Sequence, residues 1–233
     1  MDEYTVIDLE MTGLSAKKDK IIEIGAARVR QGCIAESYSK LVNPQMPIPE
    51  RITQLTGITD EMAAAGAEVD EAVEGLLDFM GADVIVGHNV RFDYSFIKQW
   101  AVNHKRPLEV SACDTLKIAR VLLPKEQPKT LEALCEYFGI QRHNAHRALD
   151  DAVETVWVFE QLKKIAQDEQ KELFVPVRLE YKAKRQTPAT VHQLNQIRTY
   201  RMEHHIQDEI AWETMTRSEA SRLMDYYYSA FGR

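Results

Sequence analysis

The 233-residue sequence predicts an α/β fold, in which a mixed β-sheet is flanked by helices and followed by a small C-terminal helical module. Three observations lead to this prediction. Strand-like apolar runs come first, helix-like periodicity then alternates with a further strand-like run, and a pair of capped helices is predicted near the end. Early hairpin-like strands joined to later β-α units are typical of a mixed sheet covered by helices.

Four segments have the length and composition of strands. The second and third flank Gln31-Gly32, a turn signal that predicts a hairpin. The predicted strands are Tyr4–Leu9, Ile21–Arg30, Cys33–Val42 and Asp83–Val86.

Five segments repeat apolar residues at intervals of three and four, which places those residues on one face of a helix. Glycines at positions 81, 87 and 139 separate the elements. The predicted helices are Val69–Met80, Phe92–Val102, Thr115–Leu122, Thr130–Phe138 and Ala148–Ile165.

The C-terminal part differs in kind from the rest. Arg178–Arg185 has an excess of positive charge, which predicts a linker. Thr187 followed by Pro188 predicts an N-cap and a first helical residue, and Thr216–Glu219 is a capping box that predicts a second helix. We therefore expect three parts: a larger domain, a linker and a helical hairpin, over residues 1–166, 167–186 and 187–233.

Composition excludes several classes of protein. No run approaches the roughly 18 apolar residues of a membrane helix, and the first residues lack a secretory signal. We therefore expect a soluble, cytoplasmic protein without a membrane partner. Cys33, Cys113 and Cys135 lack the spacing of a zinc or disulfide site and read as reduced thiols. The net charge of −7 excludes binding of nucleic acid by bulk positive charge, so such a function needs a local site.

Asp8 and Glu10 end the first predicted strand. Residues i and i+2 of a strand point to the same face, so these two carboxylates converge. A turn at Met11–Leu14 would leave them at the rim of the sheet, where sites in open α/β sheets lie. Two solvated charges at a strand end remain the alternative for this pair taken alone.

Two further acidic residues occur where helices are predicted to begin. Asp93 closes the segment Gly87–Asp93, and a carboxylate that stabilises the helix dipole is its alternative role. His146 and Asp151 flank the start of the last long helix. Five residues apart on one helix they would differ by about 140°, so His146 is predicted to lie on a loop before the helix.

Together these segments resemble the three motifs of the DnaQ-like, DEDDh 3′→5′ exonucleases. The matching patterns are Asp8-x-Glu10, Gly87-His88-Asn89-x-x-Phe92-Asp93 and His146-x-x-x-x-Asp151, in that order. The segments Leu55-Thr56-Gly57-Ile58-Thr59 and Asp114-Thr115 also match, and the first resembles the exonuclease domains of bacterial DNA polymerase III, in the epsilon subunit and the PolC-type polymerase. The resemblance covers roughly residues 1–165 and implies a ribonuclease H-like fold.

The chemistry of crowded carboxylates agrees with this resemblance. Four such groups must be protonated or bind hard cations, and oxygen ligands suit Mg²⁺ or Mn²⁺. We expect two divalent cations, which would clamp the attacking and leaving oxygens of a phosphoryl displacement. Glu10 and His146 are the expected catalytic residues, with His146 accepting the proton of the attacking water. The expected metal ligands are Asp8, Glu10, Asp93 and Asp151.

The resemblance also implies a binding site for the terminal nucleotide. Core packing is the alternative for its two large apolar members. The implied residues are Thr12, Gly13, Leu14, Thr56, Asn89 and Phe92. Other polar residues have different expected roles. Asp114 is predicted to be a helix N-cap, and His88 to support the site from behind its ligands. His143 is predicted to lie on a loop, and Asp150 to face solvent.

Gln170, Leu173 and Phe174 resemble the short Gln-x-x-Leu-Phe peptides by which bacterial replication proteins dock on the sliding clamp. The alternative is that Leu173, Phe174 and Val175 pack back onto the larger domain. Basic and aromatic residues of the C-terminal hairpin would either contact single-stranded nucleic acid or form a solvated surface over a small core.

We therefore expect a metal-dependent 3′→5′ exonuclease that acts on the 3′ ends of single-stranded or frayed DNA, in proofreading or repair, and releases 5′-mononucleotides. DNA polymerase III and the sliding clamp are its expected partners. Trimming of RNA 3′ ends is the alternative, because a few side chains that the motifs do not fix read the 2′-hydroxyl. An inactive nucleic-acid-binding adaptor is the other alternative, although it has no need of His146 or of four carboxylates.

Overall fold

The computed structural model describes residues 1–142, 145–207, 210, 212 and 215–232. It divides into two compact units, each with its own buried core. The larger unit comprises Met1–Ala101 and Pro107–Ala183, and the smaller unit comprises Val102–Arg106 and Lys184–Arg233. Residues 167–183, which the sequence places in a linker, are part of the larger unit.

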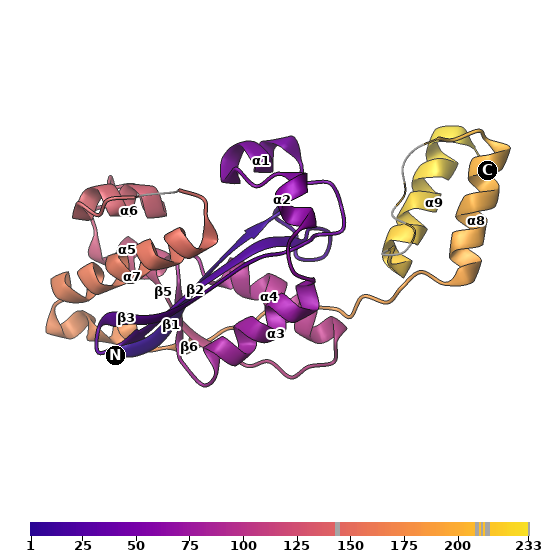
Figure 1. The fold of residues 1–233 in the computed structure, drawn as a ribbon. Coiled ribbons are helices and arrows are strands. Elements are labelled where there is room, and N and C mark those ends of the chain that lie inside the picture. Colours follow the sequence, from indigo (N-terminus) through magenta and orange to yellow (C-terminus); the bar gives the residue numbers. More distant parts are fainter. Residues whose placement is uncertain (143–144, 208–209, 211, 213–214, 233) are drawn as a thin grey trace. The chain divides into compact units, whose positions relative to one another are not determined.

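The described part of the larger unit contains one six-stranded sheet with the order β3-β2-β1-β4-β5-β6 (Figure 1). Strands β1, β2 and β3 form an antiparallel meander, β4 and β5 run parallel to β1, and β6 is antiparallel to β5. The predicted mixed sheet is confirmed, although the short β5 and β6 were not predicted. The strands are β1 (Glu3–Met11), β2 (Ile21–Arg30), β3 (Cys33–Leu41), β4 (Ile85–Gly87), β5 (Ser111–Asp114) and β6 (Val177–Arg178).

Helices cover both faces of this sheet, because successive side chains of a strand point to opposite faces. Ile7 and Leu9 of β1 belong to the core beneath α3 and α4, whereas Tyr4 and Val6 belong to the core beneath α5, α6 and α7. The helical elements are α1 (Glu50–Thr56), α2 (Asp60–Ala64), α3 (Val69–Met80), α4 (Arg91–Asn103), α5 (Thr115–Leu122), α6 (Leu131–Phe138), α7 (Ala148–Ile165) and the 3₁₀ helix η1 (Asp168–Phe174).

Local capping explains several of these helix ends. The Asp114 side chain accepts a hydrogen bond from the Leu116 N–H at the start of α5, as predicted. Thr130 caps α6 in the same way, and Gly139 ends that helix in a left-handed conformation with φ 67°. None of the helices in the described ranges is long and apolar enough to cross a membrane.

The smaller unit contains the predicted helical hairpin, formed by α8 (Val191–Glu203) and α9 (Arg217–Phe231). Helix α9 begins at the predicted capping box, in which Thr216 Oγ1 accepts from the Glu219 N–H at 3.3 Å. The predicted start of the first helix at Thr187-Pro188 is wrong. Pro188 instead forms an extended bridge with Thr216, and a second capping box at Thr190 begins α8. The buried residues in the core of the smaller unit are Ile197, Tyr200, Ala220, Met224 and Tyr227.

Candidate active site

Asp8 and Glu10 lie near the carboxyl end of β1, on the face that packs against α7. Both side chains are half-buried. The regular pairing of β1 with β2 shifts register between Glu10 and Met11, and such an irregularity often ends pairing beside a functional site. The end of the strand therefore presents two neighbouring carboxylates at the rim of the sheet.

Asp93 lies in the first turn of α4 and is 5% exposed. Its Oδ1 accepts a hydrogen bond from the Leu9 N–H at 3.1 Å, between the two acidic residues of β1. This bond ties the start of α4 to the end of β1. Asp93 is thus brought to Asp8 and Glu10 from the neighbouring β4-α4 connection.

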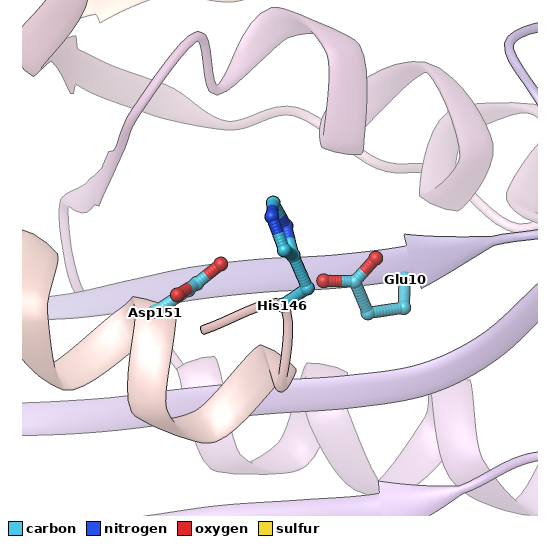
Figure 2. A group of neighbouring side chains, drawn as sticks. All are labelled: Glu10, His146 and Asp151. Atoms are coloured by element: carbon cyan, nitrogen blue, oxygen red, sulfur yellow. The ribbon is translucent and has the colours of Figure 1, made fainter. Parts of the chain in front are cut away.

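His146 and Asp151 approach Glu10 from the start of α7. His146 precedes the helix, as predicted, and has a left-handed backbone with φ 61°. Asp151 lies in the first turn and is 7% exposed. Figure 2 shows the His146 side chain standing between those of Glu10 and Asp151, and the potential ligand atoms of the three residues lie within 4.8 Å of one another.

Burial and mutual repulsion raise the pKa of the acidic groups in this cluster. Burial is the largest cause for Asp8, whose pKa is well above its ordinary value, and Asp93, Glu10 and Asp151 raise it further. Burial, Asp151 and Glu23 raise the pKa of Glu10 to about 8. Burial raises the pKa of Asp93 to about 7, although the hydrogen bond from Leu9 opposes this shift. Asp8 and Glu10 therefore sense the charges of both Asp93 and Asp151.

Asp151 has an additional partner. Burial raises the pKa of the Asp151 carboxyl group, whereas the Arg142 guanidinium opposes the shift. Arg142 Nη2 lies 2.6 Å from Asp151 Oδ1, and its Nε lies 2.6 Å from Glu154 Oε2. Arg142 therefore places one positive charge between two carboxylates that are about one helical turn apart on α7.

The donor set fits hard divalent cations. It combines several carboxylate oxygens with one imidazole, and oxygen-rich sites of this kind suit Mg²⁺ and Mn²⁺. Burial and then the neighbouring carboxylates raise the pKa of Asp8 and of Glu10, so a positive charge beside them would favour their ionised forms. A cation would supply that charge.

Three of the residues implied for nucleotide binding have side chains that are fully or partly exposed. Leu14 is 78% exposed on the loop after β1, which excludes core packing for this residue. Phe92 is half-buried, and its ring packs edge-on against Phe96 at 5.6 Å, so core packing accounts for part of its surface. Asn89 is exposed and has a left-handed backbone with φ 62°, held by a 3.0 Å hydrogen bond from its N–H to Asp114.

The other three have mainly internal hydrogen bonds or contacts. Thr12 is 1% exposed and its hydroxyl accepts from the Lys20 N–H at 3.0 Å. The Thr56 hydroxyl donates to Ile52 O at 3.0 Å and accepts from the Ile58 N–H at 3.1 Å. Gly13 is buried, and a Cβ there would lie 2.6 Å from the Asp19 carboxyl group. These hydrogen bonds and this close approach stabilise the local backbone after β1 and after α1.

The remaining polar residues lie as follows. His88 Nδ1 lies 2.9 Å from Thr115 Oγ1, so His88 links the loop after β4 to the start of α5. Asp150 is half-buried. The prediction for His143 lies outside the described residues.

Sequence reasoning missed Glu23, Arg142 and Arg147. Glu23 is 2% exposed on β2, where both Glu23 oxygens accept hydrogen bonds from Arg147. A charged residue inside the apolar run Ile21–Ile24 was a usable signal for Glu23. No local pattern identified the partners of the two arginines, because these contacts join distant parts of the chain or depend on how the loop before α7 folds.

The segment around Gln170 forms η1 in the larger unit. The Gln170 side chain accepts from the Gln167 N–H at 3.0 Å, and Leu173 and Phe174 pack against the core beneath α7. The Phe174 ring lies 5.6 Å from that of Phe159. Val175, by contrast, is 61% exposed.

Comparison with known proteins gives the relatives of this chain. A family model, RNase_T, described as Exonuclease, matches residues 5–159. The chain is 42% identical over 154 residues to the PolC-type DNA polymerase III of Clostridium perfringens, covering 66% of this chain and 11% of that protein. It is 39% identical over 158 residues to the DNA polymerase III subunit epsilon of Aquifex aeolicus, covering 67% of this chain and 78% of that protein. The chain thus spans only 11% of the PolC-type relative's length.

A solved structure gives the same result for the fold. Exonuclease X in complex with 5′ overhanging duplex DNA is 26% identical, with a TM-score of 0.56, and the match covers 72% of this chain and 96% of that one. The ribonuclease H-like fold implied by the three motifs is confirmed, as is the resemblance itself.

Proposed function

Since this chain belongs to the RNase_T exonuclease family, we propose that it is a metal-dependent 3′→5′ exonuclease that hydrolyses the terminal phosphodiester of single-stranded or frayed DNA. The products are 5′-mononucleotides. The observation that carries this proposal is the convergence of Glu10, His146 and Asp151 at the carboxyl end of β1, with Asp93 close enough to Asp8 to raise the pKa of Asp8. An inactive adaptor would gain nothing from this repulsion.

Asp8, Glu10, Asp93 and Asp151 would hold two divalent cations, Mg²⁺ or Mn²⁺. When bound, such a pair of ions supplies charge stabilisation to the attacking and leaving oxygens of an in-line displacement. The carboxylates come from β1, α4 and α7, which are regular elements packed in the core. Ligands on strands and helices are held more precisely than ligands on loops.

His146 is the proposed general base. It lies beside Glu10 and Asp151, where it can accept a proton from the attacking water during bond formation. Its position before α7, outside the helical repeat, lets the imidazole and the Asp151 carboxylate face the same point. Glu10 contributes a ligand oxygen and orients the same water.

The exposed Leu14, Asn89 and the accessible part of Phe92 would contact the terminal nucleotide. Leu14 offers an apolar side chain that can wedge against a base, and the ring of Phe92 offers a stacking surface. Thr12, Gly13 and Thr56 would act by fixing the loops that carry these contacts.

We assign the activity to DNA because the relatives at 39% and 42% identity are parts of DNA polymerase III. The same similarity supports a role in proofreading or repair in the cytoplasm, with such a polymerase as partner. We leave the sliding clamp out of the proposal, since the packing of Leu173 and Phe174 onto the core supports the alternative in which this segment completes the larger unit.

The test is degradation of single-stranded DNA and RNA of matched sequence, each labelled at the 5′ or the 3′ end, in Mg²⁺, Mn²⁺ or EDTA. We expect metal-dependent shortening from the 3′ end, faster for DNA. Asp151→Ala should abolish this shortening. Asp150 is the neighbouring carboxylate, about 100° away around α7, so Asp150→Ala should keep nearly the wild-type rate. No degradation of either polymer would overturn the proposal, and faster degradation of RNA would replace its substrate.

The role of His146 is tested with the same substrates. His146→Ala should lower kcat by about 10²–10⁴ and leave binding of the oligonucleotide unchanged, as expected when a general base is lost. Binding is measured by fluorescence anisotropy with Ca²⁺ in place of Mg²⁺. A variant with near-normal kcat removes His146 from the mechanism.

A further inference from the structure

Glu23 is a buried charge near the start of β2 that the proposed mechanism does not use. It is 2% exposed and pairs across the antiparallel register with Glu10. Residues directly opposite in such a pair point to the same face, and two like charges there repel each other. A carboxylate in this place needs a specific compensating partner.

That partner is Arg147, the residue after His146. Arg147 Nη2 donates to Glu23 Oε1 at 2.7 Å, and its Nε lies 3.1 Å from both Glu23 oxygens. This bidentate geometry fixes the orientation of the guanidinium as well as its distance from the carboxylate. The contact joins positions 124 residues apart in the sequence.

Glu23 also caps helix α7. Arg147 occupies the N-cap position but provides no side-chain acceptor, and the Ala148 N–H donates instead to Glu23 Oε2 at 2.9 Å. The helix backbone is pressed against the sheet at the same place, because a Cβ on Gly25 would lie 2.1 Å from the Ala148 carbonyl carbon. β2 therefore contacts the first turn of α7 at two neighbouring positions, Glu23 and Gly25.

We propose that the Glu23–Arg147 brace, defined as these two side chains and the Ala148 N–H, is the positioning device that sets His146 and Asp151 at their working distance from Glu10. His146 adjoins the brace, and the Asp151 N–H donates to Arg147 O at 2.9 Å within the first turn. The effect on rate rests on the proposed exonuclease function, whereas the effect on the geometry of α7 does not.

Kinetics on a single-stranded oligonucleotide test the effect on rate. Glu23→Ala and Arg147→Ala should each lower kcat by about 10–100-fold, as loss of a supporting contact does, with KM changed by less than about threefold. The double variant should be no slower than Glu23→Ala alone, because the two side chains act as one unit. The matched control is Arg30→Ala. The Arg30 guanidinium contacts both Asp83 oxygens at 2.9 Å, and its side chain is 33% exposed, against 37% for Arg147. Arg30 lies at the other end of β2 from Glu23, away from the site.

Hydrogen exchange tests the geometry without relying on activity. In Glu23→Ala, the amides of Ala148 and Asp151 should exchange faster than in wild type, while those in the middle of α7 stay protected. Glu23→Gln keeps an acceptor for the Ala148 N–H, so it should retain this protection and lose less kcat than Glu23→Ala.

Two results would overturn the brace. One is wild-type protection at Ala148 and Asp151 in both Glu23→Ala and Arg147→Ala. The other is a raised KM with unchanged kcat in Arg147→Ala, which would make Arg147 a contact to nucleic acid. If the wild-type protein hydrolyses nothing, the proposed function fails, and the exchange data still decide whether the brace holds α7.

Discussion

A single carboxyl group, that of Glu10, illustrates what the crowding of acidic residues does to the protein. Burial and the neighbouring Asp151 and Glu23 raise its pKa to about 8, against 4.5 for an ordinary glutamate, while Arg147 opposes the shift. Near neutral pH, and without a cation, Glu10 in the folded protein therefore carries a proton that the unfolded chain has lost.

This difference predicts how the stability of the metal-free protein depends on pH. The folded state binds the additional proton between pH 4.5 and about 8, so the contribution of Glu10 is complete below pH 4.5 and is lost as the pH rises through about 8. In EDTA, the urea midpoint should fall as the pH is raised from 6 to 8.5.

Glu10→Gln is the control for this experiment, because its amide does not titrate. Its urea midpoint should fall less steeply over the same range. Saturating Mg²⁺ should flatten the profile of the wild type, since a bound cation stabilises the ionised carboxylates. Identical pH profiles for wild type and variant in EDTA would show that Glu10 is not the group responsible.

At the scale of elements, local signals identified the long helices and most of the strands. The bounds of β2, α3, α5 and α7 agree with the sequence pattern, because each has a regular apolar period. The short α1, α2, η1, β5 and β6 were missed, since elements of two to seven residues give no usable period and their conformation depends on neighbouring elements.

The candidate site divides in the same way. The motif residues were found because their chemistry and spacing are visible along the chain. Glu23 and Arg147, by contrast, act through contacts between β2 and the start of α7, which only the folded arrangement creates. Thr187-Pro188 was a misleading local signal, because the better capping box three residues later begins α8.

Arg142 links an irregular segment to α7, and its removal is expected to weaken that helix. It contacts Asp151 and Glu154, whose side chains are 9% and 5% exposed, so Arg142→Ala leaves two buried carboxylates without their counter-charge. Breaking a buried pair in this way costs about 3–5 kcal/mol. Chemical denaturation in EDTA measures the loss, and added Mg²⁺ should recover more stability in this variant than in wild type.

Lys171→Ala is the matched control for an ion pair at the surface. Lys171 lies 2.6 Å from Asp168, but the two side chains are 74% and 87% exposed, so the midpoint should hardly change. If Arg142→Ala is as stable as Lys171→Ala, the contacts of Arg142 do not hold the carboxylates of α7 in place.

At the scale of the whole molecule, the two units have separate cores, and the smaller core is much the poorer. Among the residues that the structure describes, it contains five buried ones, of which Tyr227 is fully buried and stacks on Tyr200 with ring centroids 5.8 Å apart. The proposed catalytic residues all lie in the larger unit. Folding of the helical hairpin and hydrolysis should therefore be separable.

Tyr227→Ala tests this separation. Truncation of a buried aromatic residue costs about 3–5 kcal/mol, which equals what a core of this size supplies, so α8 and α9 should lose their protection against hydrogen exchange. The amides of α7 should stay protected, and kcat on a short single-stranded oligonucleotide should stay within about twofold of wild type, since the reacting groups belong to the other unit, which has its own core. Tyr226→Ala is the control, because Tyr226 is 61% exposed and its removal should leave the hairpin folded.

A parallel loss of kcat and of α7 protection in Tyr227→Ala alone would mean that the hairpin supports the catalytic unit, and the two cores would then form one cooperative structure.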